Sequence, residues 1–340
     1  MSRPAKANVS KRVTVYDVAK EAGVSAQTVS RVINNQGYIS DKSRTLVSAA
    51  VDKLGYVPNR AAQMLHTRTS NTLEIITFGN SPFKFQGPFT GMVKASQDLG
   101  YHLSFAMSPE EEVAEALNSI VSRLIDGIIF IDVHNKLGGN IPEQLQKTIP
   151  YVFLGQPSGF KGPAVSYDHR HGAHLAVNHL LDLGHTRIAE IRGPLDDIDA
   201  IERHQMWLEL ASEVGLEPHL VEIGDYSYKG GYTAALNLLA KDNAFTAILV
   251  ANDSMAVGAM RALAEQGFNV PEDVSIVGYD DAAHAAYVSP ALTTVAQDFD
   301  GLGRESIKYL VERVQHPSQA VEHRLLQPEL VIRESTAEAV

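Results

Sequence analysis

Residues 13–32 of the chain read VTVYDVAKEAGVSAQTVSRV, and this stretch decides how the amino-terminal part folds. Thr14 is placed to cap a first helix, with Asp17 three residues on as an acidic partner in the first turn. Gly23 can adopt the left-handed conformation that ends this helix and starts a turn. Ser25 can then cap a second helix that runs to about Val32. The stretch predicts two short helices joined by a tight glycine turn.

The apolar residues of this stretch suit two crossing helices. Such a pair needs a small residue at the crossing, a glycine at the turn and an apolar residue that faces back from the second helix. Ala19, Gly23 and Val29 supply these at spacings of four and six, and Val18 and Val32 fill the small core. The pattern is the helix-turn-helix signature. A helical hairpin that does not bind DNA can mimic it, so the pattern alone leaves that alternative open.

The outer face of the second helix carries Ala26, Gln27, Ser30 and Arg31. Glutamine can bond adenine bidentately, arginine can bond guanine bidentately, and an alanine methyl can contact thymine. Taken singly, Gln27 or Arg31 is equally well explained as solvated surface. Four residues apart on one helical face, the two together favour contact with base edges.

The rest of the first 70 residues completes a basic head. Ser40 or Asp41 caps a third predicted helix that ends at Leu54, before Gly55 and Pro58, and residues 59–65 are a short helix candidate before a polar linker. Residues 1–70 hold 11 Lys and Arg against 4 Asp and Glu, whereas the remainder holds 18 against 36. A basic head on an acidic body is expected if only the head meets phosphate. A solvated basic tail is the alternative.

After residue 70 the pattern changes to apolar runs that alternate with amphipathic helices. The predicted strands are Leu73–Phe78, His102–Ala106, Gly127–Val133, Tyr151–Leu154, Arg187–Ile191, Ala247–Ala251 and Val274–Gly278. The predicted helices include Phe89–Leu99, Glu110–Leu124, Ala173–Leu183 and Ser254–Gln266. Strands that are apolar throughout indicate parallel sheets covered on both faces. The length of this part suits two doubly wound α/β subdomains better than one.

Residues 13–25 and 27–32 resemble the head of the lactose-repressor (LacI/GalR) family, and residues 56–65 resemble its hinge helix. Further matches follow in order in the body: Gly184-His185, Gly193-Pro194-Leu195, Val250-Ala251-Asn252-Asp253, Val277-Gly278-Tyr279-Asp280-Asp281 and Gln297-Asp298-Phe299. The resemblance covers about residues 12–335 and is nearest to the member that gives the family its name. It implies an all-α helix-turn-helix domain followed by a periplasmic-binding-protein-like body of two doubly wound parallel-sheet subdomains.

The resemblance also implies domain limits. The helix-turn-helix DNA-binding domain would span residues 12–58, and the hinge helix and linker residues 59–71. The ligand-binding and dimerisation body would span residues 72–335. Its N-subdomain would comprise about residues 72–167 and 299–326, and its C-subdomain about residues 168–298 and 327–335.

By the same resemblance, two copies of the chain bind a near-palindromic operator. Bases would be read by Ala26, Gln27, Ser30 and Arg31 in the major groove and by Leu65 as an apolar wedge in the minor groove. Phosphates would be contacted by Thr14, Tyr16, Ser25, Asn34 and Tyr56. Leu65 has an alternative interpretation as a buried helix residue, which the small and polar run before it disfavours.

The implied ligand lies between the subdomains, at the carboxyl ends of the strands. Arg203, Asn252 and Asp280 offer the donors and acceptors that vicinal hydroxyls need. Tyr226 and Phe299 offer flat faces for a sugar ring, and Gln297 adds an amide. Alternatives stay open: Asn252 or the Asp280-Asp281 pair could cap helices, and Arg203 could pair on the surface with Asp196, Asp197 or Asp199. Trp207 is expected in the core.

The chain departs from the family's namesake in the first half of the pocket. Gly155 stands where the namesake has an acid after the strand 151–154, and the loop 79–83 is distinct. These departures leave the identity of the effector open. We also expect no tetramer built through a terminal leucine-heptad helix, because the sequence after Ser335 lacks one.

Composition and motifs favour a cytoplasmic protein without enzymatic activity. Cysteine is absent, no apolar run reaches the roughly 18 residues of a membrane span, and residues 1–12 are too polar for a secretory signal. Phosphate-cradling, nucleophile-elbow and zinc-protease motifs are missing, so we expect no cofactor. A histidine cluster invites a metal hypothesis, but nothing completes a ligand set at metal spacing: His169, His171, His174, His179 and His185.

Together these features predict a sequence-specific transcriptional repressor, a homodimer released from DNA by a small sugar-like inducer. The alternative is a corepressor-dependent regulator that binds DNA when a purine-like or other small ligand closes the body. A sugar-binding transport component shares the body fold but would carry a signal peptide and lack the basic head.

Overall fold

The computed structural model describes residues 13–33, 37–57, 69–78, 83–109, 112–120, 123–132, 141, 143–155, 160–216, 218 and 220–339. The chain divides into two units, residues 1–70 (the head) and residues 71–340 (the body). Within the described ranges, no helix is long and apolar enough to cross a membrane.

Three helices form the head: α1 (Val15–Ala22), α2 (Ala26–Ile33) and α3 (Asp41–Leu54). Thr14 and Asp17 form a capping box at α1, in which the Thr14 N–H donates to Asp17 Oδ2 at 2.8 Å. Gly23 ends α1 with φ 68°, and Ser25 Oγ accepts the N–H of Thr28 at 3.0 Å at the start of α2. These predicted caps are confirmed. Of the two caps predicted for α3, Ser40 is the one used.

A small apolar core holds the three helices together. It is formed by Val18, Ala19, Ala22, Val29, Val47 and Ala50, with Val32 half-buried at its edge. Both α1 and α2 pack against α3 and against each other. The predicted crossing of α1 and α2 through Ala19 and Val29 is therefore confirmed, because both side chains lie inside this core. Asn34, the predicted hinge helix 59–65 and Leu65 fall outside the described residues.

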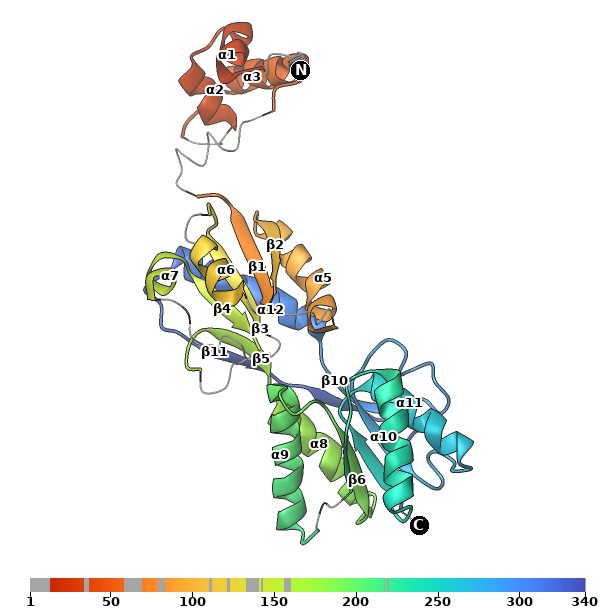
Figure 1. The fold of residues 1–340 in the computed structure, drawn as a ribbon. Helices are drawn as coiled ribbons and strands as arrows, with labels where there is room; N and C mark the ends of the chain where they lie inside the picture. Colours follow the sequence, from red (N-terminus) through yellow and green to blue (C-terminus); the bar gives the residue numbers. More distant parts are fainter. Residues whose placement is uncertain are drawn as a thin grey trace, which may run out of the picture. The chain divides into compact units, whose positions relative to one another are not determined.

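The body contains two sheets, each of six strands among the described residues (Figure 1). Sheet A has the order β11-β5-β4-β3-β1-β2, with β1 (Thr72–Phe78), β2 (His102–Ser108), β3 (Gly127–Asp132), β4 (Tyr151–Leu154), β5 (Ala164–Tyr167) and β11 (His323–Leu326). Sheet B has the order β12-β10-β9-β8-β6-β7, with β6 (Ile188–Arg192), β7 (Val221–Ile223), β8 (Ala247–Val250), β9 (Ser275–Asp280), β10 (Thr293–Ala296) and β12 (Glu329–Val331). All pairings are parallel except that of β10 with β12.

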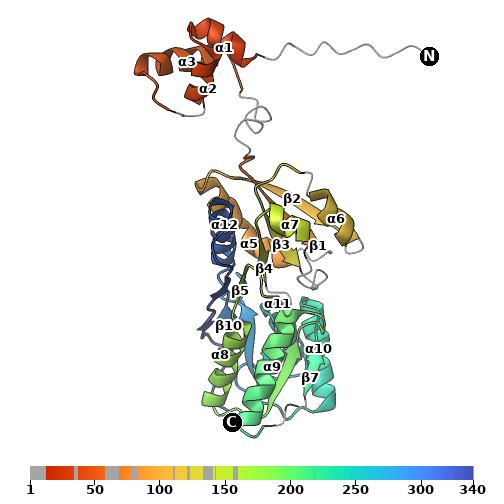
Figure 2. The same ribbon diagram turned by 90° about the vertical axis from the view of Figure 1, so that its left-hand side faces the viewer.

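Helices cover both faces of each sheet (Figures 1 and 2). On sheet A, α5 (Phe83–Asp98) and α12 (Phe299–Gln315) cover one face, and α6 (Val113–Ile120) and α7 (Glu143–Thr148) cover the other. On sheet B, α8 (His169–Asp182) and α9 (Ile198–Glu213) cover one face, and α10 (Tyr228–Lys241) and α11 (Asp253–Glu265) cover the other. Central strands such as β4 and β8 are thus buried on both sides, which is why their sequences are apolar throughout, whereas the edge strand β2 is partly exposed.

The chain crosses between the two sheets three times. Asp168 joins β5 to α8 (the first crossover), residues 297–298 join β10 to α12 (the second), and residues 327–328 join β11 to β12 (the third). The Asp168 N–H donates to the carbonyl of Leu326 at 3.0 Å. The rings of Tyr167 and Phe299 are 6.4 Å apart in an edge-to-face arrangement. These contacts place the first crossover beside the other two.

The strands and helices predicted for the body all exist, with shifted ends. The helix predicted at 89–99 begins earlier, at Phe83, and carries Pro88 inside it. The helix predicted at 110–124 is shorter and spans Val113–Ile120. Five strands of three or four residues were not predicted, namely β5, β7, β10, β11 and β12.

Candidate nucleic-acid interface and ligand site

Helix α2 turns one side into the head core and leaves the other exposed. Val29 is fully buried, whereas Gln27, Ser30 and Arg31 are exposed. Ala26 is half-buried and packs against the head core, so less of its methyl surface faces outward than the sequence predicts. The exposed row of amide, hydroxyl and guanidinium groups has the chemistry that reads base edges in a major groove.

The predicted phosphate contacts that can be placed surround this helix pair. Thr14 and Ser25 stand at the N-termini of α1 and α2, where backbone N–H groups and the helix dipole favour an anion. Both side chains also serve as caps. Tyr16 is 74% exposed, and Tyr56 is half-buried against the head core.

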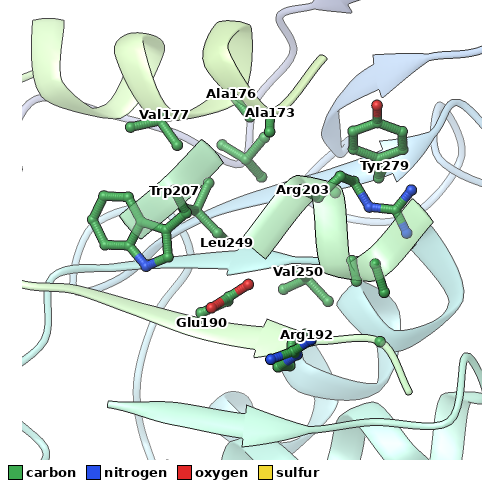
Figure 3. A pocket seen from close by; sticks show the side chains of 15 residues that line it. Ala173, Ala176, Val177, Glu190, Arg192, Arg203, Trp207, Leu249, Val250 and Tyr279 are labelled. Atoms are coloured by element: carbon green, nitrogen blue, oxygen red, sulfur yellow. The ribbon is translucent and has the colours of Figure 1, made fainter. Parts of the chain in front are cut away.

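Arg203 is the centre of the polar cluster in the body. It lies in the second turn of α9. Its guanidinium donates to His169 Nδ1 at 3.2 Å and to the Tyr226 hydroxyl at 3.3 Å. Arg203 Cζ also lies 4.5 Å from the ring centroid of Tyr279, as Figure 3 shows for the two side chains. A half-buried cation is therefore held by an imidazole and two phenol rings.

Asn252 connects two parts of this cluster. It is the N-cap of α11, where its Oδ1 accepts the Met255 N–H at 2.9 Å, so the capping role is confirmed. Its Nδ2 donates to the backbone carbonyl of Tyr226 at 3.2 Å. Tyr226 has φ 66°, a conformation that non-glycine residues seldom adopt, and this bond helps to hold it there.

The position of the Tyr226 ring also requires a glycine at residue 193, close to the Tyr226 hydroxyl. A Cβ at Gly193 would lie 2.5 Å from Tyr226 Oη, so a larger residue there would displace the ring. The Gly193-Pro194 turn therefore contributes to the site by leaving room for the Tyr226 ring.

Asp280 is the last residue of β9, with φ 111°, and its Oδ1 accepts the side-chain amide of Gln297 at 2.7 Å. Asp280 therefore ends a strand. The alternative that it caps a helix is wrong. Asp281 instead accepts the Arg333 guanidinium at 2.6 Å. Burial and the nearby Asp253 raise the pKa of Asp280 to about 7, against the lowering effects of Arg203 and Gln297.

Asp253 is a second buried carboxyl beneath this edge of sheet B. It is fully buried, and it accepts the Thr294 hydroxyl at 2.6 Å and the Ala282 N–H at 2.7 Å. Burial raises its pKa to about 7, although these hydrogen bonds act in the opposite direction.

Phe299 begins α12 on the sheet A side of the second crossover. Its ring packs against α5, where a Cβ at Gly87 would lie 2.8 Å from Phe299 Cγ. The structure thus gathers Arg203, Tyr226, Asn252, Asp280 and Gln297 at sheet B through contacts between them, and places Phe299 two residues beyond Gln297.

His169, Tyr279 and Asp253 were missed by the sequence-based search. His169 lies 34 residues from Arg203, a separation from which no spacing rule predicts contact. Tyr279 and Asp253 could have been found by considering the sequence neighbours of predicted site residues, because Tyr279 precedes Asp280 and Asp253 follows Asn252.

A cavity lies behind Arg203, between sheet B and helices α8 and α9 (Figure 3). Arg203, Trp207, Tyr279, Glu190 and Arg192 line it, together with aliphatic residues and glycines of the surrounding elements. Trp207 is 3% exposed and belongs to the core, as predicted. Glu190 Oε2 is 2.6 Å from His204 Nδ1.

The first half of the predicted pocket is only partly described. Gly155 follows β4 with φ 83°, and a Cβ there would meet nothing within 4 Å. Residues 79–82 lie outside the described ranges. Among the residues that are described, no group of three or more His, Cys, Asp or Glu is placed to hold a metal ion. His171 and His174 do share a face of α8, with ring centroids 6.5 Å apart.

Comparisons with known protein families match both units. Residues 14–59 match the bacterial regulatory proteins of the lacI family, and residues 177–336 match a periplasmic binding protein-like domain.

Individual relatives match over nearly the whole chain. The transcriptional regulator CelR of Thermobifida fusca is 35% identical, over 96% of this chain and 98% of that protein. The lactose operon repressor of Escherichia coli K12 is also 35% identical, over 96% of this chain and 91% of that protein. The crystal structure of the lac repressor dimer bound to operator and an anti-inducer superposes with a TM-score of 0.88 at 33% identity, covering 96% of this chain and 100% of that one.

Proposed function

The chain belongs to the lacI family of bacterial regulatory proteins, and we propose that it is a sequence-specific repressor of transcription that a small sugar-like effector releases from DNA. The observation that carries the DNA-binding part is the exposed face of α2, where Gln27 and Arg31 stand opposite the buried Val29. The curated relatives are transcriptional regulators, which supports a role in regulation without an enzymatic reaction.

The proposed domain limits are residues 12–58 for DNA binding, 59–71 for the hinge and linker, and 72–335 for the body. Within the body we assign about residues 72–167 and 299–326 to the N-subdomain, and about residues 168–298 and 327–335 to the C-subdomain. The strand composition of sheets A and B supports this division, since β11 joins sheet A and β12 joins sheet B.

For DNA we assign base reading to Ala26, Gln27, Ser30, Arg31 and Leu65, and phosphate contact to Thr14, Tyr16, Ser25, Asn34 and Tyr56. The exposure of Gln27 and Arg31, and the positions of Thr14 and Ser25 at helix N-termini, support the assignment. The assignments of Asn34 and Leu65 rest on the sequence alone. A homodimer would present two such heads to a near-palindromic site.

For the effector we assign Arg203, Tyr226, Asn252, Asp280, Gln297 and Phe299. A sugar hydroxyl both donates and accepts, so it can bond to a guanidinium and to a carboxylate in one site. The Nε–H of Arg203 is buried and has no hydrogen-bond partner among the described residues, which leaves a donor for a ligand. Tyr226 and Phe299 can cover the apolar face of a ring.

Solved relatives support a sugar as the class of effector. One is a CelR–cellobiose complex, with a TM-score of 0.70 at 32% identity. Another is a LacI-family regulator of Enterococcus faecium with bound ribose, with a TM-score of 0.68 at 29% identity. We propose that the protein acts in the cytoplasm, where such an effector would report the supply of a nutrient.

A selection experiment tests the proposed function. The full-length chain is incubated with a library of random DNA duplexes, and bound sequences are amplified and read. We expect enrichment of one near-palindromic sequence, because two identical heads read two half-sites. A library that shows no enriched sequence after repeated rounds would refute sequence-specific binding. Cellobiose, lactose and ribose are then added to the enriched complex; tightening by any of them would favour a corepressor mechanism instead.

A further inference from the structure

His169 occupies the point where the first crossover enters the sheet B half of the body. It is the first residue of α8 and lies two residues beyond Tyr167, the last residue of β5 in sheet A. Its side chain is buried, and its ring lies 6.2 Å from the ring of Tyr279. Asp168, immediately before it, is bonded to the carbonyl of Leu326 at the end of β11. The His169 side chain therefore contacts the candidate site, and its backbone directly follows the connection between the sheets.

The two nitrogens of His169 have different partners. Arg203 Nη1 lies 3.2 Å from Nδ1, and Asp199 Oδ1 lies 3.3 Å from Nε2. A guanidinium can only donate, so Nδ1 must accept and carries no proton. The neutral imidazole then has its proton on Nε2, which faces the Asp199 carboxylate at 3.3 Å. His169 therefore links a cation to an anion through one fixed tautomer.

Arg203 needs such a partner if it is to bind a ligand well. An arginine side chain loses rotamer freedom when a ligand fixes it, and a guanidinium that is already oriented loses less of that freedom. His169 and Tyr226 accept from two different Nη atoms of Arg203, and the ring of Tyr279 lies against one face of the guanidinium plane. Of these three, His169 is the one next to a crossover.

We propose that His169 is the positioning residue for Arg203 in the effector site, and that it links the state of this site to the first crossover. The proposal rests on the proposed function, since it assumes that Arg203 contacts the effector. A ligand that engages Arg203 shifts its guanidinium and so changes the hydrogen bond to His169, and His169 passes this change to the segment that joins α8 to β5. The second crossover has a parallel link, because Gln297 bonds to Asp280.

Two conservative variants separate this role from a general structural one. His169→Asn puts an amide oxygen near the position of Nδ1, so it can still accept from Arg203. His169→Gln puts its amide near the position of Nε2, so it can still contact Asp199 but leaves Nη1 of Arg203 without its acceptor. His171→Gln is the matched control, because His171 is exposed on the same helix.

The experiment measures the affinity of the full-length variants for cellobiose, lactose and ribose by calorimetry. Loss of a hydrogen bond to a charged group predicts about tenfold weaker binding for His169→Gln, while His169→Asn and His171→Gln stay within about threefold of wild type. In an Arg203→Lys background, His169→Gln should weaken binding no further, since its partner is already changed.

Equal affinities of His169→Gln and His169→Asn would overturn the positioning role. So would an equal loss for His169→Gln in the wild-type and Arg203→Lys backgrounds, which is the pattern of a general structural effect. A wild-type protein that binds none of the three sugars would contradict the proposed effector class itself, and this inference with it. Thermal unfolding of each variant shows that the comparison is made between folded proteins.

Discussion

Gln297 donates its side-chain amide to Oδ1 of Asp280 at 2.7 Å. Asp280 ends β9 in sheet B, and Gln297 begins the second crossover, which leads into α12 on sheet A. The backbone N–H of Gln297 also approaches the carbonyl of Asp280, at 3.4 Å. A half-buried carboxyl of the candidate effector site is thus hydrogen-bonded directly to a connection between the two sheets.

This carboxyl and its neighbour predict a pH dependence of stability. The pKa values of Asp253 and Asp280 are raised from 3.8 to about 7 in the folded protein, mainly by burial. The folded state therefore holds their protons more tightly than the unfolded state does. Their contribution to stability is fully present below about pH 4 and is lost as the pH rises through about 7.

Urea denaturation of the full-length protein between pH 5 and pH 8 measures this contribution. We expect Asp253→Asn to reduce the fall in the free energy of unfolding over this range, since the asparagine stays neutral. Asp98→Asn, at an exposed carboxyl on α5, is the control and should retain the wild-type fall. Identical pH profiles for wild type and Asp253→Asn would show that the buried carboxyl does not titrate in this range.

Asn252 predicts a separation between stability and ligand affinity. Asn252→Ser keeps a cap for the Met255 N–H but loses the amide that bonds to the Tyr226 carbonyl. We expect unfolding free energy near that of wild type for Asn252→Ser, and a loss of about 1 kcal/mol for Asn252→Ala. Both variants should bind the sugar effector more weakly, because Tyr226 is less firmly held. Wild-type affinity in Asn252→Ser would show that this amide does not support the site.

Arg31 predicts a change in sequence preference. Arg31→Ala should weaken specific operator binding by about 1–3 kcal/mol and relax the preference at one base position in each half-site. Lys20→Ala removes an exposed charge from the neighbouring helix α1 and should leave the preference unchanged. Binding selections with the two variants compare them directly. An unchanged preference in Arg31→Ala would remove Arg31 from the base-reading residues.

The parts of the fold that were predicted correctly from the sequence depend on local interactions. The capping box of Thr14 and Asp17 spans three residues, and the left-handed Gly23 ends its helix without help from the rest of the chain. The strand at 151–154 could likewise be predicted, because a strand covered on both faces is apolar at every position. Strands such as β7 and β12 have three residues each, too few to show a pattern.

The residues of the candidate site were predicted from their chemical types. The hydrogen bonds that join them to their partners were not predicted. Arg203 and Asp280 follow from their chemistry and from the family pattern. The partners that hold them, His169 and Gln297, lie 34 and 17 residues away and meet them only through the fold. The capping role of Asn252 was predicted because it is local, whereas its bond to Tyr226, 26 residues away, was not.

We propose that a ligand in the body weakens the binding of the head to DNA. The direct test titrates cellobiose, lactose and ribose against the complex of the full-length protein with its selected operator, and follows bound DNA by fluorescence anisotropy. Wild type and Asp280→Asn are compared, because Asp280 belongs to the body and its loss should leave operator affinity without sugar unchanged.

We expect at least one sugar to weaken the wild-type complex by about 5- to 150-fold, the usual range of coupling between two sites, and to leave the Asp280→Asn complex intact. By linkage, operator DNA should weaken the binding of that sugar by the same factor. A wild-type complex that tightens with sugar would contradict induction, and an Asp280→Asn complex that is still released would contradict the assignment of the site.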